Sequence, residues 1–83
     1  MLTIATLIVM PIIATVAGAK LYMYFKDHNP PHFHARDDGE EEVFDLEGKS
    51  LRGRIDPKKG KEVKKWAGEN EQFLKEKWNE FQQ

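Results

Sequence analysis

Three glycine-containing turn signals cut the N-terminal part of this 83-residue chain into segments of strand length. Glycine and acidic residues favour the backbone conformations of tight turns, and connections this short join antiparallel neighbours. The chain is therefore expected to begin as a run of mostly antiparallel strands. The signals are Ala17-Gly18, Asp37-Asp38-Gly39 and Glu47-Gly48-Lys49.

The segments between these turns have the composition and alternation of β-strands. In the second segment Leu21, Met23 and Phe25 share one face, which suits a sheet covered on at least one side. Tyr22 and Tyr24 lie on the other face, where they are expected to pack, with one hydroxyl able to reach the histidines described below. The predicted strands are Ile12–Val16, Lys20–Phe25, His32–Arg36, Glu42–Leu46 and a short edge strand over Leu51–Ile55.

The C-terminal part is predicted to be helical. Asp56-Pro57 combines an N-cap residue with a proline at the first helical position, and Gly68 is expected to stop this helix. A second helix begins near Asn70 and has an apolar stripe of aromatic and aliphatic residues. The sequence thus predicts an α+β domain, in which a small, mostly antiparallel sheet of four to five strands is followed by two C-terminal helices packed on it.

Met1 to Ala19 carries no charge, so a signal peptide or a membrane span has to be considered. No lysine or arginine precedes this apolar run and Pro11 interrupts it, which favours a buried strand and no membrane association. The run also repeats itself, since Met1-Leu2-Thr3-Ile4-Ala5-Thr6 resembles Met10-Pro11-Ile12-Ile13-Ala14-Thr15. The expected organisation is an N-terminal extension over residues 1–9, before an original start at Met10, and a single domain over residues 10–83.

All three histidines lie in one ten-residue stretch, Asp27-His28-Asn29-Pro30-Pro31-His32-Phe33-His34-Ala35-Arg36. The two prolines stiffen the backbone, and on a strand His32, His34 and Arg36 share a face. Imidazole is the commonest protein metal ligand and also titrates near neutral pH. The predicted metal ligands are Asp27, His28, His32 and His34, with a divalent cation such as zinc.

The same stretch admits other interpretations. If the protein is an enzyme, the predicted catalytic residues are His28, His32 and His34 as acid or base groups, with Arg36 or Lys20 stabilising negative charge. The histidines are otherwise structural, and tie the loop to the sheet, or belong to a strand that faces solvent.

Composition limits the remaining chemistry. The absence of cysteine excludes disulfides, thiolate metal sites and cysteine nucleophiles, and a net charge of −1 gives no overall attraction to nucleic acid. The acidic run from Asp37 to Glu42 is expected to be a solvated turn. Arg52 and Arg54 can bind an anion or simply keep an edge strand soluble. The basic cluster Lys58, Lys59, Lys61, Lys64 and Lys65 is expected to be a solvated helix surface, with nucleic-acid binding as the alternative.

The run from Met23 to His34, with its Asp-His-Asn-Pro-Pro-His-Phe-His core, resembles the short bacterial domain-of-unknown-function family forty-one-sixty. The resemblance extends over residues 10–83 and places the family's hallmark positions on Asp27, His28, Pro31, His32 and His34. It implies a cytoplasmic accessory protein that works with a small companion protein encoded nearby, in a toxin–antitoxin or regulatory pair. A homodimer is compatible with it.

Three functions therefore stay open at this point. The first is a metal-binding accessory protein in such a pair. The second is a non-catalytic module that binds protein or nucleic acid. The third is a small RNA-cleaving toxin that uses histidine acid and base chemistry.

Overall fold

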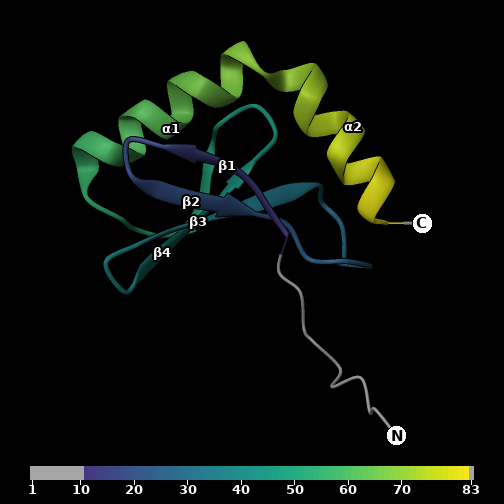
Figure 1. Ribbon diagram of the computed structural model, residues 1–83, viewed down its shortest axis with the longest axis horizontal. Coiled ribbons are helices and arrows are strands. Elements are labelled where there is room, and N and C mark those ends of the chain that lie inside the picture. Colours follow the sequence, from purple (N-terminus) through teal and green to yellow (C-terminus); the bar gives the residue numbers. More distant parts are fainter. Residues whose placement is uncertain (1–10, 83) are drawn as a thin grey trace, which may run out of the picture.

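The computed structural model describes residues 11–82, which form a five-stranded sheet with two helices arched over one side of it (Figure 1). All neighbouring strands are antiparallel and follow chain order across the sheet. The predicted α+β architecture is confirmed, and the predicted extension over residues 1–9 lies outside the described part. The elements are β1 (Ile12–Val16), β2 (Ala19–Tyr22), β3 (His32–Asp37), β4 (Glu40–Asp45), β5 (Ser50–Gly53), α1 (Pro57–Glu69) and α2 (Glu71–Phe81).

Two-residue turns set the register of the sheet. Asp38 and Gly39, which join β3 to β4, have φ angles of 53° and 83°. Positive φ at both turn residues matches the right-handed twist of the flanking strands, and glycine adopts it without strain. The prediction of a solvated turn from Asp37 to Glu42 is therefore too long, because Glu40 already begins β4. The tight turn places Arg36 opposite Glu41 and His34 opposite Val43.

The second predicted strand is also too long, because β2 ends at Tyr22 instead of Phe25. The chain leaves the sheet here, and the Lys26 backbone N–H donates a hydrogen bond to the carbonyl oxygen of Phe81 at 2.9 Å. Phe25 consequently does not join Leu21 and Met23 in the core. It is 52% exposed, and its ring packs edge-on against Phe81 at 5.0 Å.

The other two boundary corrections are small. The edge strand β5 ends at Gly53, whose φ of 76° turns the chain so that Ile55 enters the core from a loop. Helix α1 begins as predicted, with Asp56 accepting a hydrogen bond from the Lys59 N–H, but continues through Gly68 to Glu69. Asn70 then starts α2, as predicted.

The core lies between the helices and one face of the sheet. Phe33 and Ala35 of β3 are fully buried there, while His32, His34 and Arg36 alternate with them, as the sequence pattern predicts. The sheet, the loop that leads to α1 and both helices all contribute to the buried apolar cluster. It comprises Ala19, Leu21, Met23, Phe33, Ala35, Phe44, Leu46, Ile55, Val63, Ala67, Leu74, Trp78 and Phe81. Within the described residues, neither helix has the length and apolar character that crossing a bilayer requires.

Candidate metal centre

The loop between β2 and β3 carries Asp27 to the two histidines of β3. Both ends of this loop are tied to neighbouring structure. At the near end, the Lys26 backbone N–H donates a hydrogen bond to the Phe81 carbonyl oxygen at the end of α2, and the Gln82 side-chain amide donates one to the Tyr24 carbonyl oxygen at 3.3 Å. At the far end, the carbonyl oxygen of Pro30 is hydrogen-bonded to Nδ1 of the His32 ring. These anchors fix where the Asp27 carboxylate lies.

Asp27, His32 and His34 together form a group of possible metal ligands. One ligand atom from each residue lies within 4.8 Å of the other two. The Nε2 atom of His32 is 2.8 Å from Asp27 Oδ2, and the Nε2 atom of His34 is 3.9 Å from the same oxygen. The two histidines are 3% and 6% exposed, so the group is closed to bulk solvent on the histidine side.

The opposite ring nitrogen of each histidine is held by an acceptor. His32 Nδ1 lies 2.6 Å from the carbonyl oxygen of Pro30, and His34 Nδ1 lies 2.8 Å from Oε2 of Glu41. A carbonyl oxygen and an ionised carboxylate can only accept, so both Nδ1 atoms carry the hydrogen. In a neutral ring the lone pair is then on Nε2, the atom that faces Asp27.

The Nε2 atoms are unsatisfied as the residues stand. Both are buried, and within residues 11–82 neither has a hydrogen bond of acceptable geometry, even though His32 Nε2 is close to Asp27. A nitrogen lone pair and a carboxylate oxygen 2.8 Å apart repel each other unless a positive species lies between them. That species is either a proton or a metal cation.

Burial and neighbouring charges set the ionisation of the group. Burial lowers the pKa of His34 below its ordinary value, although the hydrogen bond to Glu41 acts in the other direction. Burial raises the pKa of Asp27, but the His28 backbone N–H and the attraction to His32 and His28 outweigh it, so this pKa is lowered overall. The group therefore presents a neutral imidazole and an ionised carboxylate, which are the forms that bind metals.

Glu41 is the site residue that the sequence analysis missed. Burial raises the pKa of its carboxyl, but hydrogen bonds from the Tyr22 hydroxyl and from His34 outweigh this and lower the pKa overall. The signal was present in the two-residue turn at Asp38-Gly39, since that register places Glu41 diagonally across from His34 on the same face.

Aromatic rings enclose the two histidines. Tyr22 stacks on His34 with ring centroids 5.1 Å apart, and Tyr24 packs edge-on against the same ring at 4.8 Å. Trp78 of α2 lies 5.3 Å from the His32 ring. The sequence analysis expected a tyrosine hydroxyl to reach the histidine site. The Tyr22 hydroxyl does so indirectly, because it donates a hydrogen bond to the Glu41 carboxylate that holds His34.

The remaining predicted site residues lie at the edge of the group. The His28 side chain is 74% exposed, and its Nδ1 is 2.9 Å from Asp27 Oδ1, so it contacts the carboxylate from the solvent side. Arg36 approaches Glu41 at 4.0 Å and lies over the Tyr22 ring. It is therefore on the Nδ1 side of His34, away from Asp27. Lys20 is paired with Arg36 in the sheet register and is exposed.

The fold and this site define a small α+β domain that can hold one metal ion between a loop and its sheet. The chain belongs to the family described as Domain of unknown function (DUF4160), whose model matches residues 18–79 and so includes the loop and β3. The resemblance drawn from the sequence is confirmed. No curated protein and no solved structure gives a significant match to the chain.

Acid is predicted to destabilise the metal-free protein in two stages. As pH falls below about 6.5, the unfolded chain takes up a proton at His34 before the folded protein does, because the folded pKa is lowered. Below about 4.5 the same sign applies to Glu41 and then to Asp27, whose folded pKa values are also lowered. In urea unfolding from pH 7.5 to 4, the unfolding free energy should therefore fall first below about pH 6.5 and again below about pH 4.5.

In the His34→Gln variant, the unfolding free energy should fall much less between pH 6.5 and 5 than it does in the parent. The exposed His28→Gln change is the matched control and should leave that decline in place. Unfolding free energies that stay constant down to pH 5 in the parent would contradict the assignment of a buried, neutral His34.

Proposed function

We propose that this protein binds a divalent metal ion such as zinc through Asp27, His32 and His34. One observation carries the proposal: two buried imidazoles, each held at Nδ1 by an acceptor, direct unpartnered Nε2 atoms at one ionised carboxylate. Hydrogen bonds of this kind, from the free ring nitrogen to a carbonyl or carboxylate, orient metal-binding histidines in general.

The donor set and its spacing support a metal. Two imidazole nitrogens and one carboxylate oxygen suit zinc and several neighbouring transition metals. Ligand atoms around a tetrahedral zinc lie about 3.3 Å apart when each bond is about 2.0 Å. The distances of 2.8 Å and 3.9 Å from Asp27 to the two Nε2 atoms bracket this value. Small side-chain adjustments would therefore be enough to accommodate the ion.

His28 is the nearest further donor. It follows Asp27 directly and contacts the same carboxylate from the exposed side. We assign it a supporting role, because a water molecule can supply the fourth ligand equally well at this side of the site. The histidine set predicted from the sequence is thus divided into two principal ligands and one auxiliary residue.

Acid and base chemistry on RNA is a weaker interpretation of the same residues. A general base has to come within hydrogen-bond reach of the proton that it removes. The Nε2 atoms of His32 and His34 are buried, and Arg36 lies on the other side of His34. A phosphodiester could reach them only after the loop from Met23 to Pro31 had moved away from β3.

The metal content of untagged protein, purified without chelator, tests the proposal. About one divalent ion per chain is expected in the parent. Asp27→Asn, which changes charge but hardly changes size, should abolish near-stoichiometric binding, as should the double change His32→Ala/His34→Ala. Glu41→Gln leaves all three proposed ligands in place but replaces the charged acceptor of the His34 Nδ1–H and of the Tyr22 hydroxyl with a neutral amide. It should weaken zinc binding by about 10- to 100-fold in a competition titration.

His28→Ala is the matched control in this titration and should weaken binding less than Glu41→Gln does. Circular dichroism of each variant separates loss of metal from loss of fold. A folded parent without metal that also takes up no added zinc, cobalt or manganese would overturn the proposal. So would an Asp27→Asn variant that binds zinc as tightly as the parent.

We also propose that the metal serves the regulatory or toxin–antitoxin pairing implied by the family resemblance. The loop that supplies Asp27 also carries Phe25, a large apolar side chain that is half exposed. A metal bound between Asp27 and β3 would add to the hydrogen bonds that already join Tyr24 and Lys26 to the end of α2, and would so restrict Phe25 further. A small companion protein that contacts Phe25 would then bind the metal-loaded form in preference.

Co-expression with the product of the adjacent gene tests this pairing. Chelation and Phe25→Ser should each weaken the purified complex by about tenfold. Leu51→Ser, which removes an exposed apolar side chain from the edge strand β5, is the matched control and should have no effect. A complex that is unaffected by both chelator and Phe25→Ser would contradict the proposed link.

A further inference from the structure

A cavity lies on the helix side of β4 and β5. It has a volume of about 460 Å³, within the range of small-molecule sites, and is bounded by β5, the turn at Gly48 and the first two turns of α1. Three cationic side chains line it, Arg54, Lys61 and Lys64, whereas Glu42 is the only acidic residue in the lining. Phe44 and Ile55 lie beneath it, but both belong to the core and are only 2% and 1% exposed.

The three cations have no carboxylate partner of their own. Within the described residues, the ion pairs formed by lysine and arginine involve Arg36, Lys59, Lys75 and Lys77 instead. Glu42 does not neutralise them fully, because it carries one negative charge against their three positive charges. Its Oε1 atom accepts a hydrogen bond from the Ile55 backbone N–H at 3.2 Å. Like charges gathered around a hollow repel one another, and an anion bound between them would relieve this repulsion.

The backbone fixes the shape of the cavity. Gly48 is buried, and a Cβ atom at this position would lie 2.9 Å from the carbonyl oxygen of Lys64. The turn between β4 and β5 therefore rests directly on α1, which holds the two walls at a set distance. The N-terminus of α1 forms part of the rim through Pro57 and Gly60. The Asp56 carboxylate caps this end of the helix by accepting a hydrogen bond from the Lys59 backbone N–H, so the positive character of the cavity comes from its three cationic side chains.

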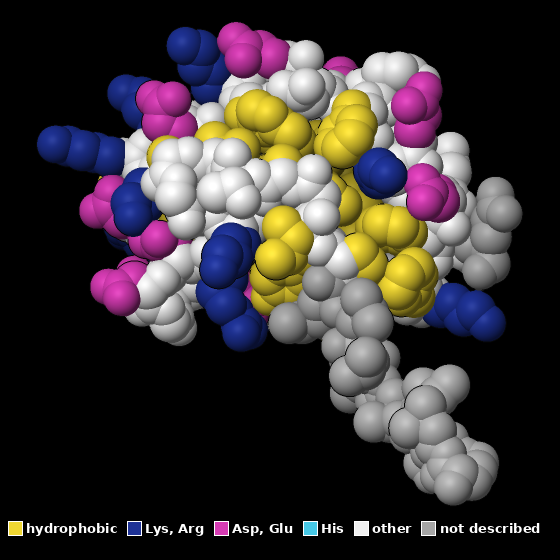
Figure 2. All heavy atoms as spheres, viewed as in Figure 1, with side chains coloured by type: hydrophobic (Ala, Val, Ile, Leu, Met, Phe, Trp, Pro, Cys, Tyr) yellow, Lys and Arg dark blue, Asp and Glu magenta, His cyan; other side chains and the backbone are white. Residues whose placement is uncertain are grey.

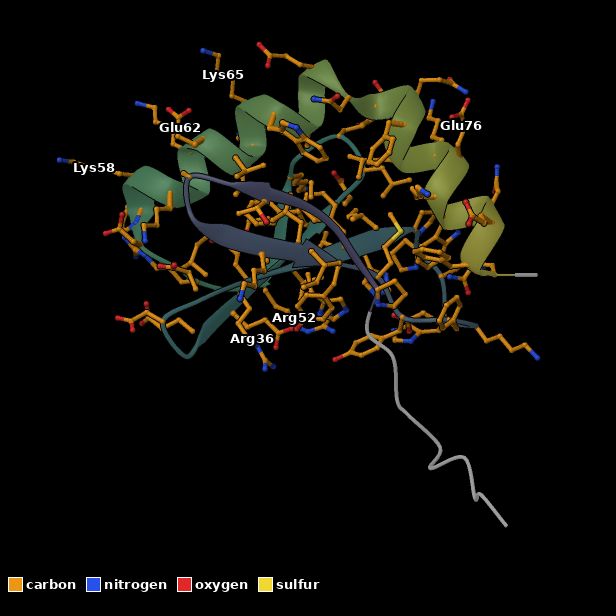
Figure 3. The ribbon with its side chains drawn as sticks, viewed as in Figure 1. Arg36, Arg52, Lys58, Glu62, Lys65 and Glu76 are labelled. Atoms are coloured by element: carbon orange, nitrogen blue, oxygen red, sulfur yellow. The ribbon has the colours of Figure 1, made fainter. Side chains whose placement is uncertain are left out.

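The surroundings favour a small anion over an extended polyanion. Lys58 and Lys65 project from α1 into solvent with Glu62 between them (Figure 3). In the space-filling view, acidic side chains are interspersed among the lysines and arginines at the end of the molecule where α1 begins, on the left of Figure 2. A nucleic-acid strand would therefore meet negative as well as positive charge outside the cavity, whereas a compact anion inside it would meet mainly the three cations.

We propose that this cavity binds the phosphate group of a small ligand of about nucleotide size. Arg54, Lys61 and Lys64 are its charge partners, and the rest of the ligand would lie between the turn at Gly48 and β5. The proposal is independent of the metal centre. Glu41 holds His34 on one face of β4, while its neighbour Glu42 lines the cavity on the other face.

Titration of the ¹⁵N-labelled full chain with adenosine 5′-monophosphate tests the proposal. Amide resonances of Gly48, Gly53 and Gly60 should shift together in a saturable way, and adenosine without phosphate should leave them unchanged. Inorganic phosphate should shift the same three amides at higher concentration. Lys61→Gln/Lys64→Gln and Arg54→Gln should each weaken nucleotide binding by about tenfold or more.

Lys75→Gln/Lys77→Gln on α2 is the matched control, because it removes the same charge from two lysines that do not line the cavity. The proposal would be overturned if this control weakened binding as much as Lys61→Gln/Lys64→Gln does. Shifts scattered over the surface, or no shift at millimolar nucleotide, would overturn it as well. Binding of a single-stranded oligonucleotide without binding of the mononucleotide would replace it with a nucleic-acid surface.

Discussion

The orientation of two buried imidazoles toward one carboxylate is the constraint on which the site depends. His32 and His34 each donate from Nδ1 to an acceptor, which leaves Nε2 of both rings directed at Asp27. Burying such atoms without a partner costs about 1–3 kcal/mol per group. A folded protein that keeps this arrangement needs a positive species among the three side chains, and a metal ion satisfies all of them at once.

Much of the fold serves to build this arrangement. Strand β3 places both histidines on the face away from the core, because Phe33 between them is fully buried. The loop after β2 returns Asp27 to them and is held in place by the end of α2. Glu41 reaches His34 because the turn between β3 and β4 has only two residues. A metal ion at Asp27, His32 and His34 would in turn fasten the loop to the sheet.

The parts of the site that follow from local pattern were predictable. The alternation from His32 to Arg36 gave the shared face, and the prolines indicated a defined loop before it. The role of Glu41 was missed because it depends on register between two strands, and an acidic residue beside a turn resembles any solvated turn residue. The division between His34, which is buried, and His28, which is exposed, depends on the path of the loop in three dimensions. Phe25 was placed in the core because strand alternation does not show where a strand ends, and β2 ends at Tyr22.

The Nε2 atoms of His32 and His34 are the proposed metal ligands, and nuclear magnetic resonance of the histidine rings observes them directly. Long-range ¹H–¹⁵N correlation spectra, recorded at pH 7.5 before and after addition of one equivalent of zinc, distinguish the two nitrogens of each ring. His32 and His34 should keep the hydrogen on Nδ1 throughout, and zinc should shift the Nε2 resonance of both, with a smaller change at His28. Rings of His32 and His34 that carry hydrogen on Nε2 in the presence of zinc, or a zinc response confined to His28, would contradict a metal site at Asp27, His32 and His34.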